Sequence, residues 1–105
     1  MNLNLKNKKA LVTGSSHGIG LEIAKCLSRE GCVVAINGRN NKKLLRASKS
    51  VSKSFPIQGD VTNYKIAKKV INNAIKNLGS IDILICNVGS GKSEKMGEES
   101  YNEWE

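Results

Sequence analysis

The sequence predicts an α/β fold, a doubly wound parallel sheet with helices on both faces and the strand order 3-2-1-4. Three observations carry this prediction. Short apolar runs alternate along the chain with segments of helical periodicity, which is typical of parallel strands joined by right-handed crossovers. The apolar runs lack polar alternation, which indicates strands covered on both faces. A glycine-rich turn follows the first run, and the 105 residues leave room for one domain.

The first part of the chain contains two expected strands around one expected helix. Residues 10–12 are a short apolar run, which predicts a buried strand. Residues 18–30 show helical spacing of their apolar side chains, and Gly31 is expected to end this helix. Residues 32–36 form the second buried strand. The Asn37-Gly38 pair is a common turn signal, so we expect the strand to end before it.

A weaker helix and a third strand follow. Residues 41–53 have an apolar face at helical spacing, so we expect a helix there. Its face consists of Leu44, Leu45, Ser48 and Val51. Residues 55–58 predict a short strand, which Gly59-Asp60 closes as a turn.

The clearest helical pattern comes next. We expect Thr62 to cap this helix and Gly79 to end it. One apolar stripe runs along it, made of Ile66, Val70, Ile71, Ala74, Ile75 and Leu78. Residues 81–86 predict a fourth buried strand, residues 87–96 a polar loop, and residues 97–105 the start of a further helix with glutamates in its first turn.

Composition narrows the class of protein. No apolar run is long enough to span a membrane or to serve as a signal peptide, so we expect a cytoplasmic protein. Three cysteines cannot form a complete disulfide framework, and Cys26, Cys32 and Cys86 are interpreted as small buried apolar residues. The net charge of +8 would suit nucleic acid or a phosphate-bearing ligand. Without exposed aromatics or a known nucleic-acid module, we interpret the lysines as solvated helix faces.

A glycine-rich segment lies between the first strand and the first helix and reads Thr13-Gly14-Ser15-Ser16-His17-Gly18-Ile19-Gly20. A dinucleotide's pyrophosphate binds at this position in doubly wound folds. Gly14 permits a tight turn, Gly18 and Gly20 let backbone N–H groups approach phosphates, and the two serines add hydroxyl donors. With Ala24, the segment resembles the T-G-x-x-x-G-I-G-x-x-x-A motif of the short-chain dehydrogenase/reductase family. The resemblance implies a Rossmann-type sheet that binds NAD or NADP.

Three further segments extend the resemblance over essentially the whole chain. Asp60 and Val61 resemble the family's Asp-Val pair, which contacts adenine. Residues 82–89 resemble the family's D-x-L-V-N-N-A-G, so Asn87 and Gly89 are expected beside the cofactor. Cys86 replaces the first Asn of that motif and Val88 replaces its Ala. Tyr101 and Trp104 look like the start of the family's next helix.

Cofactor choice is expected at the end of the second strand. An acid at that position bonds the ribose of NAD, whereas an arginine accommodates the 2′-phosphate of NADP. Gly38 stands where the acid would be, and Arg39 follows it. His17 could add a weaker contact from the glycine-rich turn. The sequence therefore predicts NADP in preference to NAD.

Two segments imitate catalytic motifs. Tyr64 and Lys68 have the Y-x-x-x-K spacing of the family's catalytic pair, but they open the third helix, too early in the chain. Residues 89–93 read G-S-G-K-S like the end of a P-loop, but Cys86 stands where a P-loop needs glycine. We interpret neither segment as a site.

The resemblance places the family's active-site Ser, Tyr and Lys after later strands. We therefore expect residues 1–105 to be a partial, truncated cofactor-binding domain, with no catalytic or metal-ligating residue assigned, and inactive alone. Hydride transfer between NADP and an alcohol or carbonyl is the family's activity. The alternatives are a non-catalytic half-Rossmann module that binds or pairs with another polypeptide, and a basic nucleic-acid binder. The open edge of the fourth strand also predicts self-association.

Overall fold

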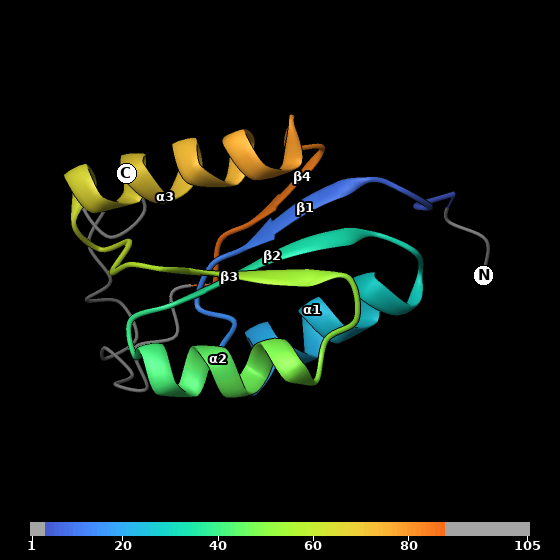
Figure 1. Ribbon diagram of the computed structural model, residues 1–105, viewed down its shortest axis with the longest axis horizontal. Coiled ribbons are helices and arrows are strands. Elements are labelled where there is room, and N and C mark those ends of the chain that lie inside the picture. Colours follow the sequence, from blue (N-terminus) through green and yellow to red (C-terminus); the bar gives the residue numbers. More distant parts are fainter. Residues whose placement is uncertain (1–3, 88–105) are drawn as a thin grey trace, which may run out of the picture.

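Strands and helices alternate along the part of the chain that the computed structural model describes, residues 4–87. The order is strand first and strand last, as the apolar pattern predicts (Figure 1). The elements are β1 (Lys9–Val12), α1 (Gly18–Arg29), β2 (Val33–Gly38), α2 (Asn41–Lys49), β3 (Ser54–Gln58), α3 (Tyr64–Leu78) and β4 (Ile83–Ile85). The helix expected from residue 97 and the residues Val88, Gly89, Tyr101 and Trp104 lie outside the described residues.

All strand pairs are parallel, and the sheet order β3-β2-β1-β4 confirms the predicted order 3-2-1-4. The central strand β1 pairs with β2 on one side and with β4 on the other, so that Leu11 lies between Ala35 and Leu84. The chain winds outward in opposite directions from β1. Doubly wound sheets bind ligands at the carboxyl end of such a switch point.

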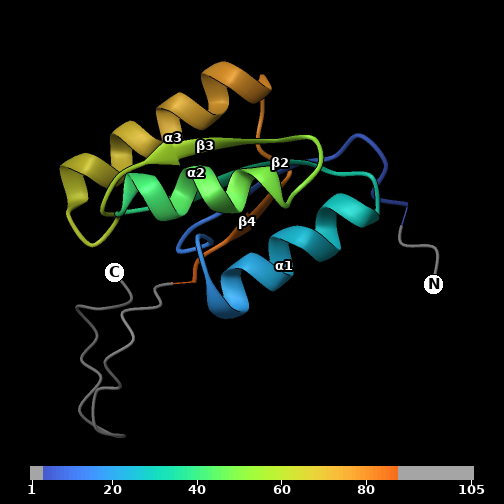
Figure 2. The ribbon, with the colours of Figure 1, turned by 60° about the horizontal axis from the view of Figure 1, so that its bottom comes forward.

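Helices cover both faces of the sheet. Figures 1 and 2 show α1 and α2 on one face and α3 on the other. Because side chains alternate along a strand, β1 sends Ala10 and Val12 toward α1 and α2, and Leu11 toward α3. The two resulting cores are almost wholly aliphatic, as the low aromatic content requires.

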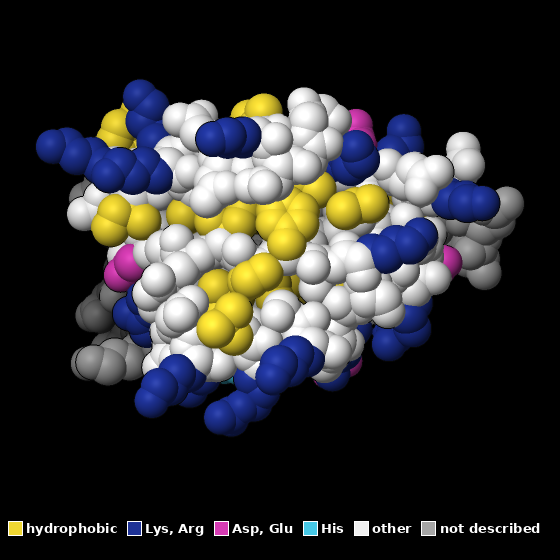
Figure 3. All heavy atoms as spheres, in the orientation of Figure 1, with side chains coloured by type: hydrophobic (Ala, Val, Ile, Leu, Met, Phe, Trp, Pro, Cys, Tyr) yellow, Lys and Arg dark blue, Asp and Glu magenta, His cyan; other side chains and the backbone are white. Residues whose placement is uncertain are grey.

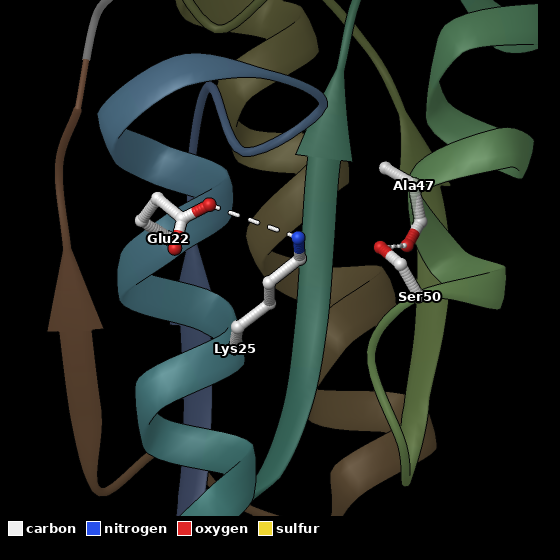
Figure 4. A network of polar contacts seen from close by, with 4 residues as sticks. All are labelled: Glu22, Lys25, Ala47 and Ser50. Atoms are coloured by element: carbon white, nitrogen blue, oxygen red, sulfur yellow. Dashed lines mark hydrogen bonds and ion pairs between the residues drawn. The ribbon is translucent and has the colours of Figure 1, made fainter.

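Local signals explain where the first two helices end. Gly31 follows α1 with φ +96°, a left-handed conformation that glycine adopts readily, so the predicted stop is confirmed. Within α1, Lys25 Nζ lies 3.7 Å from Glu22 Oε1 (Figure 4). The α2 helix begins after Asn40, which caps it, and ends at Lys49, where the Ser50 hydroxyl donates to the Ala47 carbonyl across 2.8 Å (Figure 4).

Two predicted boundaries were wrong. The β2 strand does not end before Asn37-Gly38 but includes both residues, because they pair with Ile57 and Gln58 of β3. Neighbouring strand pairing thus overrides the turn signal. The α2 helix is shorter than residues 41–53, and the side chain of Leu45 is 45% exposed rather than part of the inner face.

The third helix and the fourth strand also differ from expectation. Asn63, not Thr62, caps α3: its side chain accepts a hydrogen bond from Ile66 N, while Thr62 is bonded to Asp60. Only one edge of the predicted apolar stripe is fully buried, namely Val70, Ala74 and Leu78; Ile66, Ile71 and Ile75 are partly exposed. The β4 strand is shorter than residues 81–86, and Leu84 is 48% exposed.

The cysteine interpretation holds for one residue of three. Cys32 is fully buried, whereas Cys26 and Cys86 are exposed. Cys26 lies on the outer side of α1, and Cys86 follows the exposed edge strand. An apolar neighbourhood in the sequence did not distinguish these positions.

The basic side chains of α2 and α3 lie on the outer surface of the fold. Figure 3 shows Lys and Arg side chains over α3 and α2, with apolar side chains gathered between these helices, over β3. All lysines of α2 and α3 are exposed to solvent. Solvated basic helix faces are what the lysine-rich sequence predicts.

Candidate nucleotide-binding groove

A groove of about 130 Å³ lies at the carboxyl ends of the strands. It is formed by the turn after β1, the end of β2 with the start of α2, the turn after β3, and Asn87, which lies two residues after β4. Its lining residues are Gly14, Ser16, His17, Asn37, Gly38, Arg39, Asn40, Lys43, Gly59, Asp60, Val61, Thr62 and Asn87. Four segments far apart in the sequence therefore meet at the predicted ligand edge of the sheet.

The groove brings together most of the residues that the sequence singles out. Those that line it are Gly14, Ser16, His17, Arg39, Asp60, Val61 and Asn87. Gly18 and Ile19 lie at the adjoining start of α1, where the Ile19 side chain is 73% exposed. Ser15 is fully buried, and its hydroxyl donates to the Val12 carbonyl across 2.7 Å, so it serves the turn itself. Gly89 lies outside the described residues.

The start of α1 is open to an anion. His17 occupies the N-cap position with extended backbone, but its side chain makes no capping hydrogen bond, and the first turn holds no acid. Gly14 and Gly18 have φ values of +59° and +61°, which favour glycine. Uncapped N–H groups and the helix dipole together favour a negatively charged ligand. Residues 14–20 therefore form a cradle that is suited to an anionic group.

Gly20 is packed against the backbone of the same turn. A Cβ atom at this position would overlap the Gly14 carbonyl and lie 2.6 Å from Asn87 Nδ2. Asn87 Nδ2 donates to that carbonyl across 3.0 Å. The absence of a side chain at Gly20 therefore lets α1 approach the glycine-rich turn and the end of β4.

The end of β2 is tightly packed at Gly38, so a side chain there would require its neighbours to shift. A Cβ atom on Gly38 would lie 3.0 Å from both Cβ and Oγ of Ser16, and 3.6 Å from Leu44 Cδ1. The exposed Arg39 follows, its backbone carbonyl held by Gln58 Nε2 across 3.1 Å. With His17 and Lys43, Arg39 gives this end of the groove basic side chains.

Asp60 is the acidic residue of the groove, and its carboxylate is engaged within its own turn. Oδ1 accepts hydrogen bonds from the Thr62 hydroxyl at 2.6 Å and from Thr62 N at 3.0 Å. These hydrogen bonds, helped by the positive charge of Arg39, hold the pKa of Asp60 below its usual value. The Asp60 carboxylate is therefore ionised near neutral pH and held by Thr62 without a ligand.

Sequence reasoning missed five lining residues: Asn37, Asn40, Lys43, Gly59 and Thr62. Asn37 was interpreted as a turn residue because it precedes glycine. Asn40 caps α2 and Lys43 lies in its first turn, and nothing in the local sequence indicates that this helix start reaches the groove. The signal that could have found Gly59 is its place directly before Asp60 and Val61 in the sequence. In the structure it packs against α3, where a Cβ would lie 2.6 Å from Val70 Cγ2.

The Y-x-x-x-K imitation lies outside the groove. Tyr64 is 74% exposed at the first residue of α3, and Lys68 Nζ lies 5.8 Å from the centre of its ring. This contact is a cation–π pair between residues one helical turn apart on the protein surface.

Within residues 4–87, no helix is both long and apolar enough to cross a membrane.

The sequence matches the profile of the short chain dehydrogenase family over residues 8–105. It is 39% identical to glucose 1-dehydrogenase of Gluconobacter oxydans over 87 residues, which cover 78% of this chain and 33% of that protein. It is 37% identical to a 3-oxoacyl-[acyl-carrier-protein] reductase of Staphylococcus epidermidis over 105 residues, covering 94% of this chain and 43% of the relative. The chain thus spans less than half the length of these relatives.

Solved structures share the fold. The actinorhodin polyketide ketoreductase with NADPH superimposes with a TM-score of 0.78 at 27% identity, covering 93% of this chain and 39% of the ketoreductase. The 3-ketoacyl-(acyl-carrier-protein) reductase of Brucella melitensis, complexed with NADH, gives a TM-score of 0.71 at 26% identity, over 76% of this chain and 33% of that one. Structures similar to this one therefore hold either dinucleotide.

Proposed function

This chain belongs to the short-chain dehydrogenase family, and from that premise we propose that it supplies the cofactor-binding portion of an NADP-dependent oxidoreductase. The reaction would transfer hydride between NADP and an alcohol or carbonyl substrate. When bound, the nicotinamide would supply or accept the hydride. The residues of this chain would bind and orient the dinucleotide.

The observation that carries the choice of NADP is the end of β2. Gly38 stands where an acidic side chain would bond the ribose of NAD, so this position of the groove carries no carboxylate. Arg39 lines the groove directly after it, and its guanidinium is suited to pair with a 2′-phosphate. Lys43 and His17 add basic groups from the neighbouring turn and helix. Together, these basic side chains favour NADP, the more negatively charged of the two cofactors.

Each segment of the groove has a part in this proposal. The turn after β1, with Gly14, Ser16 and the start of α1 at Gly18, Ile19 and Gly20, would hold the pyrophosphate. Asp60 and Val61 would lie against adenine. Asn87 would close the groove beyond β4, with Gly89 after it in the sequence.

The test is calorimetric titration of the protein with NADPH and with NADH. We expect NADPH to bind at least about tenfold more tightly, since a charge-assisted pair contributes on the order of 1.5–3 kcal/mol. Arg39→Asp should reverse the preference. Arg29→Asp, the same charge change in the last turn of α1 and outside the groove lining, is the control and should leave it intact. Equal affinity for both dinucleotides in the unmodified protein would refute the choice of NADP.

A further inference from the structure

Asn37 is a polar side chain buried inside a strand. It is 1% exposed in β2, and its neighbours in the strand, Ile36 and Gly38, are buried as well. Burying an amide without partners is destabilising, so the position of this side chain depends on where its hydrogen bonds go.

The side-chain amide reaches the loops on both sides of β2. Nδ2 donates to the carbonyl oxygens of Ile57 at 3.0 Å and Gly59 at 3.1 Å, in and after β3. Oδ1 accepts from Gly14 N at 3.3 Å, in the turn after β1. The two carbonyls can only accept and the N–H can only donate, so these partners fix the orientation of the amide.

The backbone of Asn37 adds two contacts to the glycine-rich turn. Asn37 N donates to Ser15 Oγ across 2.9 Å, and Asn37 O accepts from Ser15 N across 2.7 Å. The Ser15 hydroxyl in turn donates to the Val12 carbonyl at the end of β1. One residue thus joins the end of β1, the turn after it and the turn after β3.

The joined segments are those that carry the groove. Gly14 and Ser16 stand on one side of Asn37, Asp60 and Val61 follow Gly59 on the other, and Arg39 comes two residues later in the chain. We infer that Asn37 is a positioning residue of the cofactor groove, which sets the spacing between its phosphate side and its adenosine side. This inference rests on the proposed function. Only an amide of this length supplies two donors and one acceptor at these places: Asp lacks the donors, and Leu has the shape without either.

The test compares Asn37→Leu with Asn77→Leu, the same change at an exposed amide of α3. Binding of NADPH is titrated beside two smaller probes, adenosine 2′-monophosphate and inorganic pyrophosphate, each of which reaches one side of the groove. In Asn37→Leu, we expect NADPH affinity to fall about tenfold and the affinity of each small probe by less than about threefold. Asn77→Leu should change none of them. A purely structural residue would lower stability without this split, so losses of equal size for all three ligands overturn the inference.

A second measurement uses the unmodified protein and does not require the variant to fold. The side-chain amide protons of Asn37 and the backbone amide proton of Gly14 should exchange slowly with solvent by NMR, while those of the Asn77 side chain exchange fast. Fast exchange at Asn37 overturns the inference. An unmodified protein that binds neither dinucleotide overturns both the proposed function and this inference. An Asn37→Leu variant that binds NADPH as tightly as the unmodified protein does overturns the inference alone.

Discussion

The side-chain amide of Asn87 donates to the carbonyl oxygen of Gly14 across 3.0 Å, joining residues 73 positions apart. The backbone N–H of Asn87 adds a bond of 3.0 Å to the Thr13 hydroxyl. These contacts fasten the end of β4 to the turn after β1. The first residue of the groove beyond the edge strand therefore helps to shape the proposed phosphate cradle.

Gly20→Ala should disrupt this junction. The added methyl group would overlap the Gly14 carbonyl and crowd Asn87 Nδ2, so α1 must move away from the turn. We expect NADPH affinity, measured by calorimetry, to fall by more than about tenfold. Gly79→Ala is the matched control: its φ of +88° imposes strain, but the space around it is open and it lies outside the groove lining. It should lower the melting temperature and leave NADPH affinity unchanged. A Gly20→Ala protein that binds NADPH normally would contradict the proposed cradle.

Sequence alone predicted the strand order and most of the groove because these follow from local pattern and chain order. The glycines of residues 14–20 stand between a strand and a helix, and parallel strands bring their carboxyl ends to one edge. Asp60 and Asn87 then enter the groove as residues that follow β3 and β4.

The position of Asn37 could not be predicted from the local sequence. Its preference for turns is a local property, whereas its place in β2 depends on pairing with Ile57 and on hydrogen bonds to Gly59 and Gly14. The same limit applies to Leu84 and Cys86. Their exposure depends on which elements lie beside β4, and an apolar run does not reveal this.

Thiol labelling should distinguish the three cysteines. Cys26 and Cys86 are exposed and should react with a water-soluble disulfide reagent within minutes at neutral pH, whereas Cys32 should react only as the chain unfolds. Burial, aided by the negative charges of Glu30 and Asp82, raises the pKa of the Cys32 thiol. The folded chain therefore favours the neutral thiol.

The raised pKa of Cys32 gives a dependence on pH. The stability associated with the neutral thiol is fully present below the ordinary thiol pKa of about 8.5 and is lost as pH rises through the higher folded-state value. The melting temperature should thus fall in this alkaline range, and it should fall less steeply in Cys32→Ala. In the labelling experiment, mass spectrometry of the labelled peptides identifies which thiols have reacted. Rapid labelling of Cys32 at neutral pH would disprove its burial.

Tyr64→Phe should have no effect on carbonyl-dependent oxidation of NADPH. Tyr64 is exposed at the start of α3 and outside the residues that line the groove, so its hydroxyl is not placed to pass a proton to a bound substrate. We expect the 105-residue chain to show no carbonyl-dependent oxidation of NADPH, followed as loss of its absorbance. Turnover that disappears in Tyr64→Phe would show that the Tyr64–Lys68 pair is catalytic after all.

The two edges of the sheet differ in how they resist pairing with another chain. At one edge, β3 carries Pro56, which cannot donate a backbone hydrogen bond. At the other edge, β4 pairs with β1 and has no second strand partner among residues 4–87. The nearby carboxylate of Asp82 accepts a hydrogen bond from Lys9 N across 2.8 Å, so its charge is held at the neighbouring strand. Edges without proline or free charge are prone to association.

The isolated 105-residue chain should therefore self-associate through β4, despite its charge of +8. Leu84 is 48% exposed on this strand, and Leu84→Lys should shift the chain toward monomer because a lysine at an edge opposes strand pairing. Leu45→Lys is the matched control, since Leu45 is 45% exposed but lies on α2. Sedimentation velocity at increasing protein concentration measures the effect. If both variants dissociate equally, general repulsion rather than the β4 edge governs association, and a chain that stays monomeric throughout would mean that this edge is already closed.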